Sequence, residues 1–160
     1  MKQRTIKSDI EIVGIGLHKG VPVRMRLEPL PSNSGIIIYR SDAAVTIPLK
    51  KEYVVDTKMA TVLGKDGVVV STIEHLLSAI YAYGIDNLRV VLDNDEIPIL
   101  DGSASGYCML IEEAGIQEQE ESKKAIKIKK EVVVTTEDGK RVSLKPSNRI
   151  VYDFEIKFNH

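Results

Sequence analysis

The chain has 160 residues, of which 43% are hydrophobic and 28% charged, a composition typical of globular proteins and unlike that of disordered ones. A formal net charge of -1 argues against a nucleic-acid-binding surface. No apolar run is long enough for stable membrane insertion and no signal peptide follows Met1, so we expect a cytoplasmic protein. The single cysteine, Cys108, cannot form a disulfide within the chain, which fits a reducing compartment.

The first 115 residues are predicted to form an α+β unit. Apolar and polar residues alternate over 21–27, which predicts a half-buried strand with Val21, Val23, Met25 and Leu27 on its inner face. Short β-branched or apolar runs predict further strands at 36–39, 68–70 and 88–92.

Two helices are predicted in this unit. The first begins at Ser71 or Thr72 and ends near Gly84, with a core stripe made of Ile73, Leu76, Leu77 and Ile80. The second runs from about Ser103 to Ala114 and is followed by Gly115. Its apolar residues have the same spacing: Tyr107, Leu110, Ile111 and Ala114.

The charged stretch at 118–124 (EQEESKK) is the best candidate for a domain boundary. We therefore expect an N-terminal domain over 1–120 and the first strands of a second, incomplete domain over 121–160. Asp138-Gly139 predicts a hairpin turn in the second domain. A last strand is predicted over 150–158, with an apolar face that needs a covering layer: Ile150, Tyr152, Phe154, Ile156 and Phe158.

The pair Glu74-His75 is the most informative chemical feature. At about 100° per residue, His75 points roughly 160–200° away from the core stripe of its helix. Its own face continues through the small residues Ser78, Ala79 and Ala82, which suggests a second layer packed closely there. A neutral imidazole is a good zinc ligand, and an adjacent carboxylate can act as a general base toward water.

A purely structural interpretation of the same residues remains open. Ser71-x-x-Glu74 has the pattern of a capping box, in which the glutamate closes the start of the helix, and His75 could be an ordinary surface residue. One histidine also cannot hold catalytic zinc, which takes three protein ligands and an open position.

Other candidate segments carry weaker signals. The glycine-rich run 14–20 precedes a strand and so is not a dinucleotide fingerprint; it is either a tight turn or a loop that presents His18 near a ligand. The acidic run 93–96 is interpreted as a solvated loop. Asp101-Gly102-Ser103 is interpreted as a turn with a helix cap, and Cys108 as buried and inert.

Several motifs together resemble the zinc-dependent UDP-3-O-acyl-N-acetylglucosamine deacetylases of lipid A synthesis. The resemblance covers the whole chain, and the matching motifs occur in the family's order and spacing. They are Gly14-Ile-Gly16-Leu17-His18-Lys-Gly20, Asp56-Thr57 with Thr61, Ser71-Thr72-Ile-Glu74-His75-Leu, Gly84-Ile85-Asp86-Asn87, Glu96-Ile-Pro98-Ile-Leu-Asp101-Gly102-Ser103-Ala104 and Phe154-Glu-Ile-Lys-Phe158-Asn-His160.

The resemblance implies a fold of two similar domains, each an antiparallel sheet with two helices, and hydrolysis of the acetamide of a UDP-linked, acylated amino sugar. It implies Glu74 as the general base and His75 as a Zn²⁺ ligand. It further implies substrate-binding roles for His18, for Met59 and Thr61 in the loop beside the metal, and for Phe158 near the nucleotide.

Two departures from the family pattern shape the functional hypotheses. Ala60 stands where some relatives have a cysteine near the metal, which excludes a thiolate there. The family's other zinc ligands and its catalytic histidine acid are expected beyond position 160, so this chain is expected to be the N-terminal part of such an enzyme and inactive alone. The alternatives are an assembly or binding module that pairs with a separate C-terminal half, and a non-enzymatic scaffold.

Overall fold

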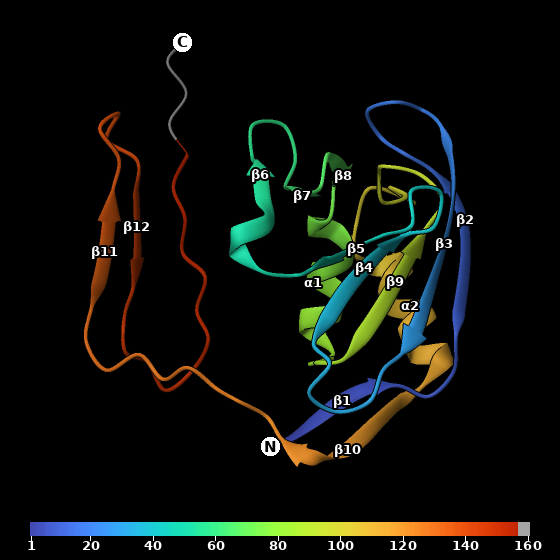
Figure 1. Cartoon of the computed structure of the whole chain (residues 1–160). Coiled ribbons are helices and arrows are strands. Elements are labelled where there is room, and N and C mark those ends of the chain that lie inside the picture. The colour runs from blue at the N-terminus through green and yellow to red at the C-terminus, as the bar shows by residue number, and fades with distance from the viewer. Residues whose placement is uncertain (157–160) are drawn as a thin grey trace. The chain divides into compact units, whose positions relative to one another are not determined.

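The computed structural model describes residues 1–156 and divides the chain into two compact units, Met1–Lys123 and the residues from Lys124 onward (Figure 1). The first unit is α+β, with two helices and several mainly antiparallel sheets, as the sequence predicts. Within the described residues, no helix combines the length and apolar character that a membrane span requires.

A five-stranded sheet forms the main layer of the first unit. The strand order is β2-β3-β9-β4-β5, and every neighbouring pair is antiparallel except β4 and β9. The strands span Ile10–Ile15 (β2), Pro22–Pro29 (β3), Ile36–Arg40 (β4), Val45–Pro48 (β5) and Leu88–Leu92 (β9).

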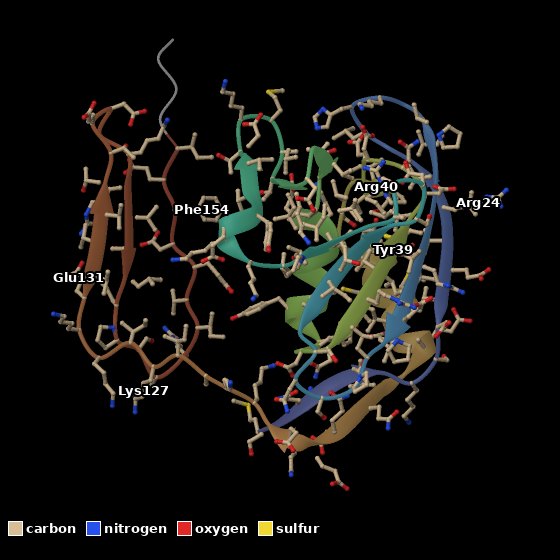
Figure 2. All side chains as sticks on the ribbon, in the orientation of Figure 1. Arg24, Tyr39, Arg40, Lys127, Glu131 and Phe154 are labelled. Carbon is tan, nitrogen blue, oxygen red and sulfur yellow. The ribbon has the colours of Figure 1, made fainter. Side chains whose placement is uncertain are left out.

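Strand β3 shows how the sequence pattern sets the sheet face. Val23, Met25 and Leu27 are buried and face the core, whereas Pro22, Arg24 and Arg26 are exposed (Figure 2 labels Arg24). Val21, expected on the inner face, lies one residue before the strand and is 39% exposed, so the buried face of the strand begins at Val23.

Helices α1 (Glu74–Ala82) and α2 (Ser105–Ala114) lie against one face of this sheet, behind it in the view of Figure 1, and contact each other. The core that they share with the sheet includes Ile73, Leu76, Ile80, Tyr107 and Ile111, all fully or nearly fully buried. The two helices and the sheet thus form two packed layers, in agreement with the expected α+β domain of an antiparallel sheet plus two helices.

The details of α1 correct three expectations. The helix begins at Glu74 rather than at Ser71 or Thr72. Leu77 is only half-buried, although it was expected in the core stripe. Of the small residues expected on a second buried face, Ala79 is fully buried. Because α1 is short and packs against α2 as well as the sheet, its buried face is wider than a single stripe and takes in Ala79. Ser78 and Ala82 remain exposed.

Two smaller sheets complete the first unit. A 3-10 turn (Lys51–Tyr53) leads into β6 (Val54–Asp56), β7 (Val62–Lys65) and β8 (Val68–Val70), which pair antiparallel. The second small sheet pairs β1 (Lys2–Ile6) with β10 (Ile116–Ser122).

Strand β10 contains most of the charged stretch that was expected to separate two domains. The backbone of 116–122 pairs with β1, and the Gln119 side chain donates a hydrogen bond to the Leu30 carbonyl at 2.8 Å. The charged side chains of this strand face solvent, so a polar composition does not prevent the pairing. The first unit accordingly extends through Lys123.

In the second unit, β11 (Val132–Thr135) and β12 (Arg141–Leu144) form the hairpin predicted from Asp138-Gly139. Gly139 has a φ of 84°, which the turn requires. Residues 145–156 form no strand. The strand predicted over 150–158 is therefore wrong as far as residue 156, because this alternating segment does not pair with any of the strands. Phe158, which that prediction included, lies outside the described residues.

Candidate functional site

The start of helix α1 carries the predicted catalytic pair. Glu74 is the first residue of the helix, and its Oε2 accepts a hydrogen bond from the Thr61 backbone N–H at 3.1 Å. Glu74, His75 and Thr61 are all half-buried. The carboxylate is therefore held by a neighbouring loop, with one oxygen engaged by an amide.

The capping-box interpretation is wrong for this helix. The N-cap position is Ile73, and no side chain caps the helix. The Ser71 hydroxyl instead donates to the Asp95 carbonyl at 3.3 Å, while the Ser71 N–H donates to the same carbonyl at 2.9 Å. Ser71 is thus bound to the segment at 95–97, which leaves the Glu74 carboxylate available for the contact with Thr61.

The loop between β6 and β7 places the other predicted residues of this region. Asp56 accepts hydrogen bonds from the N–H groups of Thr57 at 2.7 Å and Lys58 at 3.0 Å, which fixes the start of the loop. Met59 is 83% exposed, whereas Thr61 lies beside Glu74. The structure brings Thr61 to Glu74 and leaves Met59 exposed to solvent.

Thr72 lies in a strained backbone conformation two residues before Glu74. Its φ of 58° is a genuine outlier for a β-branched residue, since most residues at positive φ are glycine, asparagine or aspartate. Such strain persists only where surrounding contacts hold it, and it concentrates at functional sites. The Thr72 hydroxyl donates to Glu96 Oε1 at 2.8 Å.

Glu96 corrects the expectation of a solvated acidic loop at 93–96. Glu96 is only 2% exposed, whereas Asp93, three residues earlier, is exposed. The Glu96 carboxylate accepts hydrogen bonds from the backbone N–H of His18, at 3.1 and 3.2 Å to its two oxygens, and of Lys19 at 3.4 Å. One sequence feature indicated burial, though not these contacts: Glu96 directly precedes the apolar run Ile97–Leu100.

Gly16, in the loop at 16–21 that carries His18 (the His18 loop), and Gly14, near the end of β2, allow this close approach. A Cβ at Gly16 would lie 2.4 Å from Glu96 Oε2, and a Cβ at Gly14 would lie 2.8 Å from the Pro98 Cβ. The His18 residue itself is exposed, and the Lys19 ammonium forms an ion pair with Asp95. Both readings of this loop are therefore compatible: it is a tight turn, and it presents His18 at the surface.

The metal-binding capacity of this region is limited. Among residues 1–156, no group of three or more His, Cys, Asp or Glu side chains is arranged to hold a metal ion. His75 is half-buried, outside the fully buried core, and Glu74 is next to it. The donor types fit zinc, but the described residues offer at most part of the three-ligand set that catalytic zinc requires.

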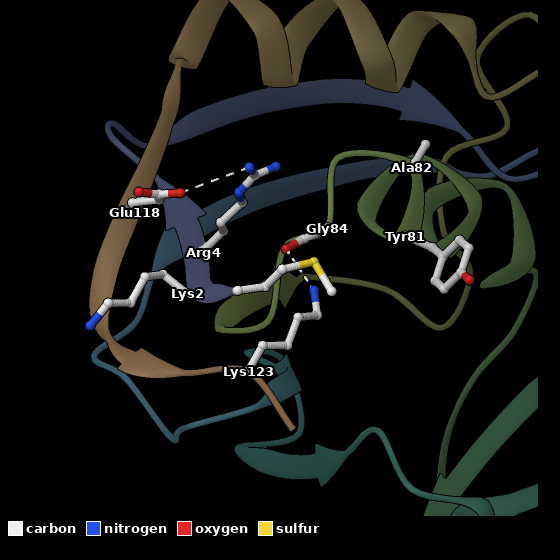
Figure 3. Close-up of a pocket in the computed structure, with 8 residues that line it drawn as sticks. Lys2, Arg4, Tyr81, Ala82, Gly84, Glu118 and Lys123 are labelled. Atoms are coloured by element: carbon white, nitrogen blue, oxygen red, sulfur yellow. Dashed lines mark hydrogen bonds and ion pairs between the residues drawn. The ribbon is translucent and has the colours of Figure 1, made fainter. Parts of the chain in front are cut away.

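A separate pocket of about 190 Å³ lies near the first strand, away from these residues (Figure 3). Arg4 faces Glu118 across it at 3.9 Å, and the Lys123 ammonium donates to the Gly84 carbonyl at 3.1 Å. Its lining residues are Met1, Lys2, Arg4, Tyr81, Ala82, Gly84, Glu118 and Lys123, none of which the sequence singled out for catalysis.

Three candidate residues remain: Asp101, Cys108 and Phe158. The Asp101 carboxylate accepts hydrogen bonds from the Ser103 N–H at 3.0 Å and hydroxyl at 2.9 Å, and the backbone bond lowers the pKa of Asp101. This is the turn that the sequence predicts before α2. Cys108 is half-buried on α2. Phe158 lies outside the described residues, so its predicted role stays a prediction.

Comparison with known proteins agrees with these motifs. The family model for UDP-3-O-acyl N-acetylglycosamine deacetylase (LpxC) matches residues 3–160. Proteins named UDP-3-O-acyl-N-acetylglucosamine deacetylase from Aliarcobacter butzleri, Nautilia profundicola and Helicobacter pylori are 81%, 64% and 59% identical to the chain. Each match covers 100% of this chain and 53%, 54% and 54% of the respective relative.

The chain thus spans about half the length of the curated relatives that it matches. The family match extends over nearly all of its residues and includes both units of the structure. The chain belongs to the UDP-3-O-acyl N-acetylglycosamine deacetylase family.

Proposed function

We propose that this chain supplies one side of the active site of a zinc-dependent deacetylase that acts on UDP-3-O-acyl-N-acetylglucosamine in the cytoplasm, during lipid A synthesis. The observation that carries the proposal is the Glu74 carboxylate, held by the Thr61 amide beside the half-buried His75 in a family member. The substrate and the reaction are those for which the relatives are named.

The proposed roles follow from the chemistry of these side chains. Glu74 accepts the proton of the attacking water, because a carboxylate with one oxygen bound to an amide keeps a second oxygen for the proton. His75 would be one of the residues that hold Zn²⁺. When bound, the ion would supply Lewis-acid chemistry toward an amide carbonyl and toward water.

The other zinc ligands and the acid that protonates the leaving amine would come from the part of the relatives that this chain does not cover. His18, exposed on its loop, is proposed to contact the charged portion of the substrate. Met59 and Thr61 are proposed to bind substrate from the loop beside the metal, and Phe158 to lie near the nucleotide. Under this proposal, the 160-residue chain is inactive by itself.

A hybrid protein tests the proposal. It joins this chain to the remaining residues of the 81%-identical Aliarcobacter butzleri relative, and is assayed with zinc for release of acetate from UDP-3-O-acyl-N-acetylglucosamine. We expect turnover by the hybrid and none by the chain alone. Glu74→Gln should lower kcat at least about 100-fold, since general bases contribute on the order of 10² to 10⁴.

Glu113→Gln is the matched control, because Glu113 is an exposed glutamate on α2. It should leave turnover unchanged. Robust deacetylation by the 160-residue chain alone, or full activity of the Glu74→Gln hybrid, would refute the proposed division of the site.

A second candidate function is an assembly module that pairs with a separately supplied C-terminal half. The exposed apolar side chains of the second unit favour it: Ile150, Val151, Tyr152, Phe154 and Ile156 are each more than half exposed (Figure 2 labels Phe154). Surfaces of this kind usually mark an interaction site. Mixing the chain with the missing half of the relative as a separate polypeptide should then restore zinc binding, and a chain that remains monomeric in the mixture would exclude this candidate.

A further inference from the structure

The carboxylate of Glu96 connects two segments that are far apart in sequence. On one side it accepts hydrogen bonds from the backbone N–H groups of His18 and Lys19. On the other side it accepts a hydrogen bond from the Thr72 hydroxyl at 2.8 Å. Glu96 is 2% exposed, so its carboxylate is shielded from water.

The backbone around Glu96 reinforces the same connection. The Ile97 N–H donates to the Ser71 carbonyl at 3.1 Å, and the Ser71 N–H donates to the Asp95 carbonyl at 2.9 Å. On the other side, the Ile99 N–H donates to the Ile15 carbonyl at 3.0 Å. The segment at 95–99 therefore lies between the His18 loop and the turn that precedes α1, and Glu96 extends its side chain to both.

The contacts of Glu96 suit a group that fixes geometry. Burying a carboxylate is costly unless hydrogen bonds compensate, and Glu96 accepts such bonds from two loop amides and from the Thr72 hydroxyl. The donors to Glu96 are neutral backbone amides and a hydroxyl. The buried Glu28, by contrast, forms ion pairs with Arg26 and Arg89.

We propose that Glu96 is a positioning residue that holds the His18 loop and the Thr72 turn in a fixed relation, and thereby sets where His18 lies relative to Glu74 and His75. The strained φ of Thr72 depends on the same contact: Thr72 keeps this conformation, in the turn that leads into α1, while its hydroxyl donates to Glu96. The catalytic meaning of the arrangement rests on the proposed function, but the arrangement itself does not.

Amide hydrogen exchange on the ¹⁵N-labelled 160-residue chain tests the proposal. Glu96→Gln keeps one carbonyl oxygen as an acceptor and replaces the other with an NH₂ group that cannot accept a hydrogen bond. We expect the His18 and Lys19 amides to exchange at least about tenfold faster in this variant, while the Val90 amide in the central sheet keeps its rate. Chemical shifts should change at Thr72, Glu74 and His75 as well.

Glu28→Gln is the matched control, since it neutralises another buried glutamate without contact to either segment. It should leave the amides of His18 and Lys19 unchanged. If Glu96→Gln does not fold, Thr72→Val removes only the hydroxyl and keeps the side-chain shape. Loss of the Thr72 hydroxyl can reach the His18 loop only through Glu96, so Thr72→Val should still change the chemical shifts of the His18 and Lys19 amides.

The outcomes separate this proposal from the one on which it rests. Unchanged exchange at His18 and Lys19 in Glu96→Gln, or no response of the His18 loop to Thr72→Val, overturns the positioning role. In the hybrid protein, Glu96→Gln should lower kcat at least about tenfold while zinc content stays at the unsubstituted level. A hybrid without any deacetylase activity would refute the proposed function and leave the exchange result standing.

Discussion

The Glu74 carboxylate and the Thr61 backbone amide lie 3.1 Å apart, from Oε2 to nitrogen, and join the start of helix α1 to the loop that follows strand β6. Of the two roles that the sequence left open for Glu74, the structure excludes one, that of closing its own helix. The glutamate does not cap its own helix; it is oriented by a neighbouring loop, next to His75.

The contribution of this contact to stability is small and measurable. Glu74→Ala leaves the Thr61 N–H without its carboxylate partner, and we expect a loss of about 1 kcal/mol in the free energy of unfolding, because both groups are half-buried and water can partly replace the bond. Glu74→Gln retains an acceptor oxygen and should lose less. Urea unfolding of the chain measures both, with the exposed Glu113→Ala as control; equal stability of Glu74→Ala and the unsubstituted chain would show that the contact contributes nothing.

The close approach of Gly16 to Glu96 predicts a steric effect. Gly16→Ala would place a Cβ 2.4 Å from Glu96 Oε2 and 2.9 Å from its Cδ, and the buried carboxylate cannot move without losing its hydrogen bonds. We expect a loss of about 1–3 kcal/mol in the free energy of unfolding.

Gly106→Ala is the control for this substitution. Its Cβ would approach the Leu100 Cδ1 at 3.0 Å, which is the end of a flexible side chain, and alanine favours the α2 helix in which Gly106 lies. This variant should unfold at the same urea concentration or a higher one. A Gly16→Ala chain as stable as Gly106→Ala would contradict the packing around Glu96.

The buried Tyr107 should make the free energy of unfolding depend on pH in the alkaline range. Burial raises the pKa of Tyr107, and its hydroxyl donates to the Pro98 carbonyl. Above pH 10, the unfolded chain loses this proton more readily than the folded one, so the stability present below pH 10 falls as pH rises, by about 1 kcal/mol at one pH unit above 10.

Tyr107→Phe removes this part of the pH dependence and, at neutral pH, costs about 1–2 kcal/mol because the Pro98 carbonyl loses its donor. Urea unfolding at pH 8 and pH 11 measures both effects. Tyr81→Phe, which removes an exposed hydroxyl, should change stability at pH 8 by less than about 0.5 kcal/mol. The interpretation fails if Tyr107→Phe loses as much stability between pH 8 and pH 11 as the unsubstituted chain.

The sequence predicted the parts of the fold that depend on local patterns. The alternation in β3, the apolar stripes of α1 and α2 and the Asp138-Gly139 turn each follow from residue spacing. Where pairing with distant segments decides, the pattern was insufficient: residues 116–122 form a strand because β1 lies beside them.

The site was only partly accessible to the same reasoning. Glu74 and His75 could be singled out from helical geometry and motif resemblance, but the hydrogen bond from Thr61 to Glu74 crosses 13 residues of sequence. Glu96 was missed because its acidic neighbours suggested a solvated loop, while its hydrogen-bond donors lie 78 and 24 positions away. Long-range hydrogen bonds to a buried carboxylate leave no periodic trace in a sequence.

The exposed apolar residues of the second unit predict an effect on association. Replacing Ile150 and Phe154 together with serine should leave the unfolding of the first unit unchanged, because both side chains belong to the second unit and are largely exposed. Binding to the separately expressed remainder of the relative should weaken at least about tenfold. Isothermal titration measures the binding; the exposed Thr135→Ser in the hairpin is the control, and undiminished affinity of the double variant would contradict an interface there.

Zinc content of the hybrid protein tests the central claim most directly. After dialysis, elemental analysis should find about one zinc ion per hybrid molecule, markedly less for His75→Ala, and an unchanged amount for His18→Ala, because a catalytic zinc site needs each of its three protein ligands. A His75→Ala hybrid that retains a full equivalent of zinc with undiminished affinity would contradict the account.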